Sequence, residues 1–148
     1  MTTDTLGNAG FWRRMAALLY DGFLLTAIWV ASTTAIVALQ GDADLASGIA
    51  FQLFLYTEAA IFFVYFWHFK GQTLGMQVWK IRAVNDAGEI LSLAECLVRF
   101  FFATFSLMFL GLGFVWIIFD RNNLAWHDHA SGSRVIYLGA NPYQNSAD

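Results

Sequence analysis

Four charged residues lie inside long apolar stretches of the chain, where a charge is costly. Arg14 opens the first stretch and Asp21 follows seven residues later, while Glu58 and Arg99 lie in the second and third stretches. A charged residue in a membrane helix costs roughly 2.5–3.5 kcal/mol on insertion scales, so it persists where it has a partner or a function. Ion or proton conduction is one such function, and these residues are the first candidates for a site.

The spacing of these residues predicts which of them make contact. Arg14 and Asp21 share a helix face, because seven residues make about two turns. Counted at ~1.5 Å per residue, Asp21 and Arg99 lie at similar depths from the same membrane surface. We therefore predict an ion pair between Asp21 and Arg99, with Arg14 as the rival partner of Asp21. Glu58 has no evident partner and is expected to be a neutral, hydrogen-bonding acid.

Two interpretations of this group stay open. In the first, Asp21, Glu58 and Arg99 line a path for an ion or a proton, as intramembrane carboxylates do in proton-coupled transporters. In the second, the Asp21–Arg99 pair is a structural staple that sets the register of two helices. Three short spans enclose little space, so the first interpretation also predicts an oligomer.

The tail carries a second group of polar residues, Asp120, His127 and Asp128, which would share one face of a continuous helix. Imidazole and carboxylate groups are plausible metal ligands, but their spacing here matches no metal-binding motif. We therefore expect a polar junction at the membrane surface, with no metal.

The loop after the second apolar stretch contains Gly71, Thr73 and Gly75 in the sequence KGQTLGM. It lacks the lysine pattern of a phosphate-binding loop, so it predicts a tight turn. The chain also contains no nucleophile elbow, dinucleotide fingerprint or paired-cysteine site. The sequence accordingly predicts no catalytic residues, no cofactor and no enzyme.

Composition identifies the elements that must hold these residues. Of 148 residues, 58% are hydrophobic, 18% are aromatic and only 13% are charged, against about 25% charged in soluble domains. This composition is typical of an all-α integral membrane protein, with the lipid bilayer as its surroundings. The net charge is −3 and the basic residues form no run, so no nucleic-acid partner is expected.

Three apolar segments are long enough to span a membrane, which takes about 20 residues. They are residues 15–39, 48–69 and about 94–119, the first two joined by the polar residues 40–47. The third segment fits one full span, which we favour. The alternative is a broken or re-entrant helix that turns at 111–113 and keeps the tail on the side of the loop 70–95.

The loop 70–95 predicts a short hairpin-like unit. Residues 79–84 alternate apolar and polar side chains as a strand does, 85–88 have turn composition, and 89–91 are a possible return strand. Ser92 and Glu95 form a capping-box pattern that begins the third helix. Residues 133–138 read as another strand, which could pair with 79–84 if the tail returns to that side.

The distribution of basic residues predicts the orientation. Arginines flank the start of the first helix, the loop 70–95 also contains basic residues, and the loop 40–47 has none. The positive-inside rule then places the N-terminus and the loop 70–95 in the cytoplasm. We expect one membrane domain over 10–138, with flexible termini at 1–9 and 139–148.

The segments GFWRRMAALLYD, KGQTLGM, KIRAVNDAGEILS and GLGFVWIIFDRNNLAWHDHASGSRVI resemble the RDD family of small bacterial membrane proteins. The family is named for one arginine and two aspartates. By resemblance these are Arg14, Asp21 and Asp128, with Asp120 as the competing second aspartate, and Arg99 matches a recurrent arginine. A threonine is common where Ser133 stands, and both side chains supply a hydroxyl.

The resemblance implies a multi-pass protein of the bacterial inner membrane. Transport of unidentified ligands is the role usually suggested for the family. We therefore expect transport or handling of a small ion or solute through the buried charged residues, in a homo-oligomer or with a membrane-protein partner. The alternative is an accessory or scaffold subunit of a larger membrane complex.

Overall fold

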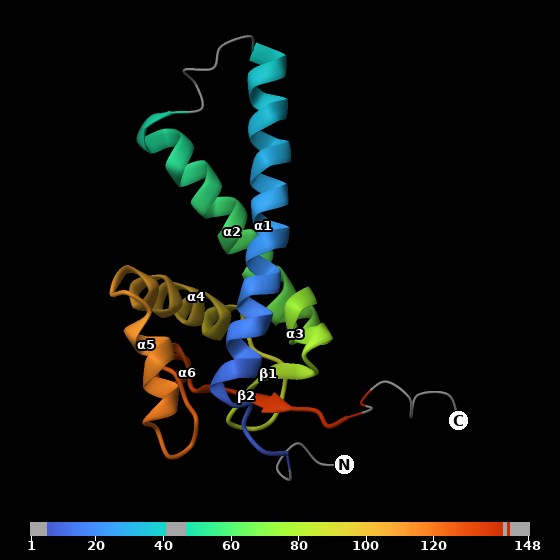
Figure 1. Cartoon of the computed structure of the whole chain (residues 1–148), viewed down its shortest axis with the longest axis vertical. Helices are drawn as coiled ribbons and strands as arrows, with labels where there is room; N and C mark the ends of the chain where they lie inside the picture. The colour runs from blue at the N-terminus through green and yellow to red at the C-terminus, as the bar shows by residue number, and fades with distance from the viewer. Residues whose placement is uncertain (1–5, 41–46, 141, 143–148) are drawn as a thin grey trace, which may run out of the picture.

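The computed structural model of the chain describes residues 6–40, 47–140 and 142. Two long helices rise from a smaller assembly of short helices and two strands (Figure 1). Helix α1 spans Phe11–Gln40 and helix α2 spans Gly48–Lys70. Both are long and apolar enough to cross a membrane, which confirms the first two predicted spans. Residues 41–46 of the expected polar connection, and 1–5, 141 and 143–148 of the expected flexible termini, lie outside the described residues.

The third apolar segment is helical but is not one straight span. Helix α4 covers Leu93–Met108, and a short pair, α5 (Leu112–Val115) with the 3-10 turn η3 (Trp116–Ile118), follows it. The two parts are bent by 105°. Gly111 takes a left-handed conformation at the break (φ 74°), which a residue without a Cβ adopts at little cost. Our preference for a straight third span is therefore wrong, and the segment is broken near the glycines.

The junction between α2 and α4 is compact and locally determined. Gly71 ends α2 in a left-handed conformation. Thr73 then caps helix α3 (Leu74–Val78), its hydroxyl accepting a hydrogen bond of 3.2 Å from the amide of Met76. At the start of α4 the predicted capping box is confirmed, with the Ser92 amide donating to Glu95 at 2.7 Å and the Glu95 amide donating to Ser92 at 3.3 Å.

The two strands form a small antiparallel sheet. Strand β1 (Ile81–Asn85) pairs with strand β2 (Ser133–Tyr137), with Ala83 opposite Val135. Both predicted strands are confirmed, but the predicted local hairpin is wrong. Residues 89–91 form no strand, because Asn85 and Glu89 close a turn through hydrogen bonds of 2.8 and 2.9 Å. The partner of β1 instead comes from the tail, which lies on the same side as the loop 70–95.

The start of the chain also joins this assembly. The Ala9 amide donates to Val135 at 2.7 Å, and the Tyr137 amide donates to Gly7 at 3.0 Å. Residues 7–9, which we expected within a loose terminus, are therefore held against β2. Helix α6 (Trp126–Ser131) precedes β2 and packs against α4.

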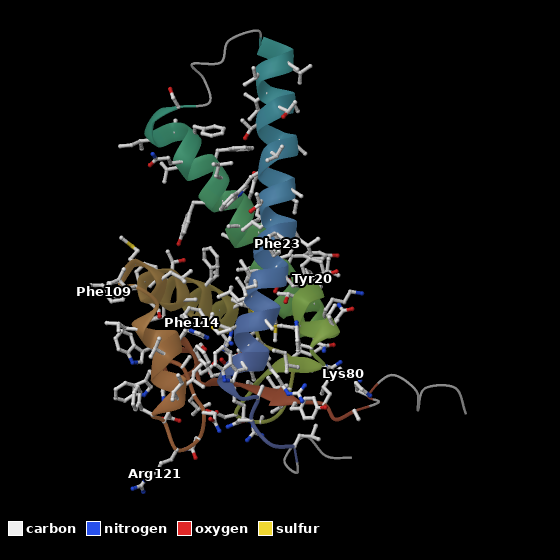
Figure 2. All side chains as sticks on the ribbon, in the orientation of Figure 1. Tyr20, Phe23, Lys80, Phe109, Phe114 and Arg121 are labelled. Atoms are coloured by element: carbon white, nitrogen blue, oxygen red, sulfur yellow. The ribbon has the colours of Figure 1, made fainter. Side chains whose placement is uncertain are left out.

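The buried core surrounds the sheet and does not lie between the long helices. Ile81, Ala83, Leu91, Val135 and Ile136 are each at most 2% exposed. Along the long helices and the broken segment, apolar side chains such as Phe23 and Phe109 point outward (Figure 2), as lipid-facing residues do. The polar side chains of Lys80 and Arg121 lie at the level of the lower assembly in Figure 2.

Candidate functional site: a buried arginine–aspartate cluster beside a cavity

Asp128 joins two arginines from distant parts of the chain. The Arg99 guanidinium donates from Nη1 to Oδ1 of Asp128 at 2.5 Å, and Arg14 donates from Nη1 to Oδ2. The backbone amide of Ala125 donates to the same Oδ2 at 2.9 Å. The Asp128 side chain is fully buried. Helices α1, α4 and α6 are therefore tied together at one carboxylate.

The cluster of Arg14, Arg99 and Asp128 carries one net positive charge. Burial alone would raise the pKa of Asp128, but the two guanidinium groups outweigh it and hold that pKa below its usual range. Asp128 is thus an anion at neutral pH, and two cations face it. Ser133 adds a further acceptor for Arg99, with Oγ 2.6 Å from Nη1. A second arginine exceeds what a simple ion pair needs.

Arg14 also binds the backbone in two places, just before α1 and in the loop before α6. Its Nε donates to the carbonyl of Ala9 at 2.9 Å, and its Nη2 donates to the carbonyl of Asn123 at 2.8 Å. Planar guanidinium groups with five donors suit such multiple contacts. Arg14 therefore fixes the loop before α6 against the first turn of α1.

Asp21 belongs to a separate contact. Thr73 donates its hydroxyl to Oδ2 of Asp21 at 2.5 Å, and the amide of Gly75 donates to Oδ1 at 2.8 Å. The predicted Asp21–Arg99 ion pair is wrong, because Arg99 donates to Asp128. The prediction assumed that the helix carrying Arg99 runs parallel to α1, whereas α4 lies across the direction of α1 (Figure 1).

Glu58 lies higher, between the two long helices. Ser32 of α1 donates its hydroxyl to Oε2 of Glu58 at 3.0 Å, so this residue has the partner that the sequence did not reveal. Glu58 does not line the cavity described below. The four intramembrane charged residues thus form three separate groups: Asp128 with Arg14 and Arg99, Asp21 with α3, and Glu58 with Ser32.

The tail residues do not share a helix face, because the chain leaves the helix between Asp120 and α6. Asp120 accepts hydrogen bonds of 2.9 Å from the amides of Asn122 and Leu124, and these bonds lower its pKa. His127 and Asp128 lie on α6 itself. Over the described part of the chain, the model contains no group of three His, Cys, Asp or Glu side chains that could hold a metal ion.

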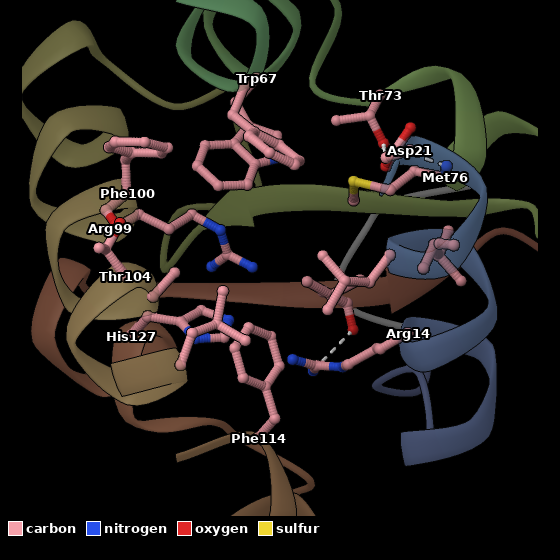
Figure 3. Close-up of a pocket in the computed structure, with 17 residues that line it drawn as sticks. Arg14, Asp21, Trp67, Thr73, Met76, Arg99, Phe100, Thr104, Phe114 and His127 are labelled. Carbon is pink, nitrogen blue, oxygen red and sulfur yellow. Dashed lines mark hydrogen bonds between the residues drawn. The ribbon is translucent and has the colours of Figure 1, made fainter. Parts of the chain in front are cut away.

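A cavity of about 100 Å³ lies beside the cluster. In Figure 3, Arg14 from α1 and Arg99 from α4 point toward the same space, with Trp67 above and His127 and Phe114 below. Burial, aided by the nearby guanidinium groups, lowers the pKa of His127 to about 3, so its ring is neutral. The other lining residues are mostly apolar: Ala17, Leu18, Asp21, Phe63, Thr73, Met76, Ile81, Phe100, Ala103, Thr104, Leu107 and Val135.

Sequence reasoning missed two residues of this site. Trp67 lies near the end of the second apolar stretch, a position typical of membrane-interface residues, yet it is 7% exposed and faces the guanidinium of Arg99, whose Cζ lies 5.1 Å from its ring. Ser133 was noted only for its hydroxyl. Ser133 is the first residue of β2, and its partner could be identified only once the strands were paired.

Comparison with known proteins places the chain in a family. No curated protein and no solved structure matched it. The model of the RDD family matches residues 8–132, a range that contains Arg14, Asp21, Arg99 and Asp128. The match covers most of the chain and includes the whole of the buried cluster, so this protein belongs to the RDD family.

Proposed function

We propose that this protein is a non-catalytic membrane transporter or ion-handling protein that binds a small ion or solute at the Arg14–Arg99–Asp128 cluster. One observation carries the proposal: a buried cluster with one net positive charge borders a cavity. A purely structural pair would need one arginine for one aspartate. Arg14 also holds backbone carbonyls, but these leave its charge unbalanced, and a ligand at the cavity would balance it, since an uncompensated buried charge destabilises a fold.

The position of Asp21 supports transport over the alternative of an accessory subunit. Asp21 lines the cavity, whereas a protein that only stabilises a partner has no need of a charged cavity wall. Glu58 lies elsewhere, so it is a weaker candidate for the same path.

The orientation in this proposal follows the basic residues of the sequence. The N-terminus, the loop 70–95 and the tail lie in the cytoplasm, and the protein resides in the bacterial inner membrane. The cavity then opens near the cytoplasmic ends of α1 and α2. Two spanning helices and one broken segment enclose only part of a path across the bilayer, so transport involves a homo-oligomer or a membrane-protein partner.

Flux measurements on reconstituted vesicles test this function. Vesicles containing the full chain are given gradients of sodium chloride, potassium chloride or sodium isobutyrate, and internal pH and membrane potential are followed with dyes. We expect a flux in at least one gradient, lowered at least tenfold by Arg99→Gln. The exposed Arg121→Gln variant is the matched control and should retain the flux. Glu58→Gln should also retain it, and a loss of flux in that variant would show that Glu58 carries protons.

The absence of flux in every gradient would favour the accessory role. One observation supports the accessory role: the broken segment has many exposed apolar side chains, which a partner helix could cover. Among them are Phe101, Met108, Leu110 and Phe119. Mass measurement of the protein purified in mild detergent then identifies an oligomer or a partner.

A further inference from the structure

We propose that the cavity binds a small organic monocarboxylate, with its carboxylate against Arg99 and Trp67 and its apolar body among the aromatic side chains. This inference rests on the proposed function and names the class of solute. It is carried by two buried donors of the cavity wall, Nε of Arg99 and Nε1 of Trp67, that have no acceptor among the described residues.

Two buried donors on the cavity wall have no partner. The Nε of Arg99 and the Nε1 of Trp67 make no hydrogen bond to any described residue, and these residues are 3% and 7% exposed. Most buried polar groups in proteins are hydrogen-bonded, and a donor left without an acceptor costs about 1–3 kcal/mol. Two such donors on one wall indicate a ligand that supplies acceptors.

A third buried nitrogen faces the same cavity. The Nδ1 of His127 also lacks a partner among the described residues. Its Nε2 lies 3.6 Å from Oδ1 of Asp128, which can only accept, so the proton of the neutral ring is favoured on Nε2 and Nδ1 is an acceptor. The donors that face a carboxylate in this cavity are therefore those of Arg99 and Trp67.

The carboxylate oxygens near the cavity are already occupied. Both oxygens of Asp21 accept hydrogen bonds, one from Thr73 and one from Gly75. Both oxygens of Asp128 accept from arginines. A bare cation needs several oxygen ligands, and the carboxylate oxygens here each already accept at least one hydrogen bond. A carboxylate needs donors, and those are free.

The charge of the Arg14–Arg99–Asp128 cluster agrees with this choice. Arg14 and Arg99 face a single anion, Asp128, so one added carboxylate neutralises the cluster. Asp21 lies on the opposite side of the cavity from Arg99 in Figure 3, next to Thr73. The anion-binding wall is therefore the one formed by α4, α6 and the end of α2.

The remaining walls select an apolar body of limited size. Phe63, Phe100, Leu107 and Phe114 line the cavity, and small-molecule sites combine such apolar walls with a few placed polar groups. The cavity of about 100 Å³ is smaller than the ~150 Å³ engineered cavity that accepts benzene. A branched carboxylate of about four carbons, such as isobutyrate, matches this volume.

Calorimetric titration of the full chain in mild detergent tests the proposal with three probes of one shape. These are isobutyrate, neutral isobutyramide and cationic isopropylammonium. We expect isobutyrate to bind at least about tenfold more tightly than the other two, as a charge-assisted hydrogen bond implies. Equal binding of isobutyrate and isobutyramide, a preference for isopropylammonium, or no binding of isobutyrate would overturn the proposal.

Two variants locate the carboxylate. Trp67→Phe keeps a ring but removes the indole donor, and Arg99→Lys keeps the charge beside Asp128 but removes Nε. We expect each to weaken isobutyrate binding by about fivefold to tenfold. Trp79→Phe, at a half-exposed position outside the cavity, is the matched control and should bind as the parent does. Undiminished binding by both Trp67→Phe and Arg99→Lys would contradict the assignment, and if one variant does not fold, the other still decides.

This titration and the vesicle experiment fail separately. A sodium or potassium flux that needs Arg99, without isobutyrate binding, would leave the proposed function standing and remove this ligand class. Isobutyrate binding with no flux in any gradient would support the ligand class and contradict the proposed transport function.

Discussion

The backbone amide of Gly75 donates a hydrogen bond of 2.8 Å to the carboxylate of Asp21. The two residues are 54 positions apart, and their contact brings α3 directly against α1. A Cβ at position 75 would lie 2.2 Å from the carbonyl oxygen of Ala17 and 2.9 Å from Asp21. A glycine at position 75 of α3 is thus required by the close approach of two helices, and Thr73, the N-cap of α3, supplies the second donor to Asp21.

Gly75→Ala should therefore separate α3 from α1. We expect a loss of about 1–3 kcal/mol in stability, as overpacking of a tight contact usually costs, seen as a lower Tm and a smaller folded fraction in detergent. Gly22→Ala is the matched control: it lies in α1 with nothing within 4 Å of a Cβ, and alanine favours a helix. Equal effects of the two substitutions would show that the contact at Gly75 is not tight.

Asp128 should be the most sensitive position of the buried cluster. Asp128→Ala leaves two guanidinium groups without their anion, and loss of one member of a buried pair costs on the order of 3–5 kcal/mol. Arg14→Ala leaves Asp128 with Arg99 and should cost less. In a double-mutant cycle for unfolding, Arg99 and Asp128 should couple by at least ~1 kcal/mol. Coupling of Arg99 to Asp21, and not to Asp128, would contradict the pairing of Arg99 with Asp128 and would support the Asp21–Arg99 ion pair predicted from the sequence.

His127 should make the protein less stable in mild acid. Its pKa lies near 3 in the fold, below its ordinary value of 6.5, so between these values the unfolded chain binds a proton that the folded chain does not. Stability from this group is therefore complete above pH 6.5 and declines as pH falls toward 3. We expect a loss on the order of 1–2 kcal/mol between pH 7 and pH 5, measured as Tm in detergent.

The variant His127→Gln cannot take up this proton. Its Tm should change less between pH 7 and pH 5 than the Tm of the parent, even if its stability at pH 7 is lower. His129→Gln, at an exposed position on the same helix, is the control and should keep the parent's slope. A His127→Gln profile as steep as that of the parent would assign the acid sensitivity to another group.

The paired strands predict that the loop 70–95 and the tail react from one side of the membrane. Single cysteines at Ala87 and Ala140, both exposed, should be labelled by an impermeant maleimide from the same side, because β1 and β2 are hydrogen-bonded. A cysteine at Ala43, in the loop without basic residues, should be labelled from the other side. Labelling of Ala43 and Ala87 from one side would contradict the two-span core, and opposite labelling of Ala87 and Ala140 would contradict the sheet.

The local features of this fold could be predicted from the sequence. The two spans follow from apolar length, the start of α4 from Ser92 and Glu95, and the turn after β1 from the composition of 85–88. Each depends on neighbours within a few residues. The Asp21–Arg99 prediction failed because it needed the direction of the helix that carries Arg99, and α4 lies across the direction of α1 instead of along it (Figure 1).

The site needed contacts between distant parts of the chain. Asp128 reaches Arg14 because residues 7–9 and β1 both pair with β2, and alternation within a strand does not reveal its partner. His127 and Asp128 were noted as a polar junction, yet nothing in their spacing indicated two arginines as partners. Trp67 has the sequence position of an interface anchor, and the broken segment encloses it.

Arg14 and Asp128 are 114 positions apart, and this separation determines how long a growing chain waits before the cluster can form. At about 5–20 residues per second, a ribosome adds Asp128 roughly 6–23 seconds after Arg14. For that interval Arg14 is without its carboxylate, Arg99 is added only 29 residues before Asp128, and residues 7–9 are without the strand that they join. A ribosome that stalls before residue 128 thus leaves a chain with two membrane helices and an unassembled charged end, which a quality-control protease can distinguish from the finished fold.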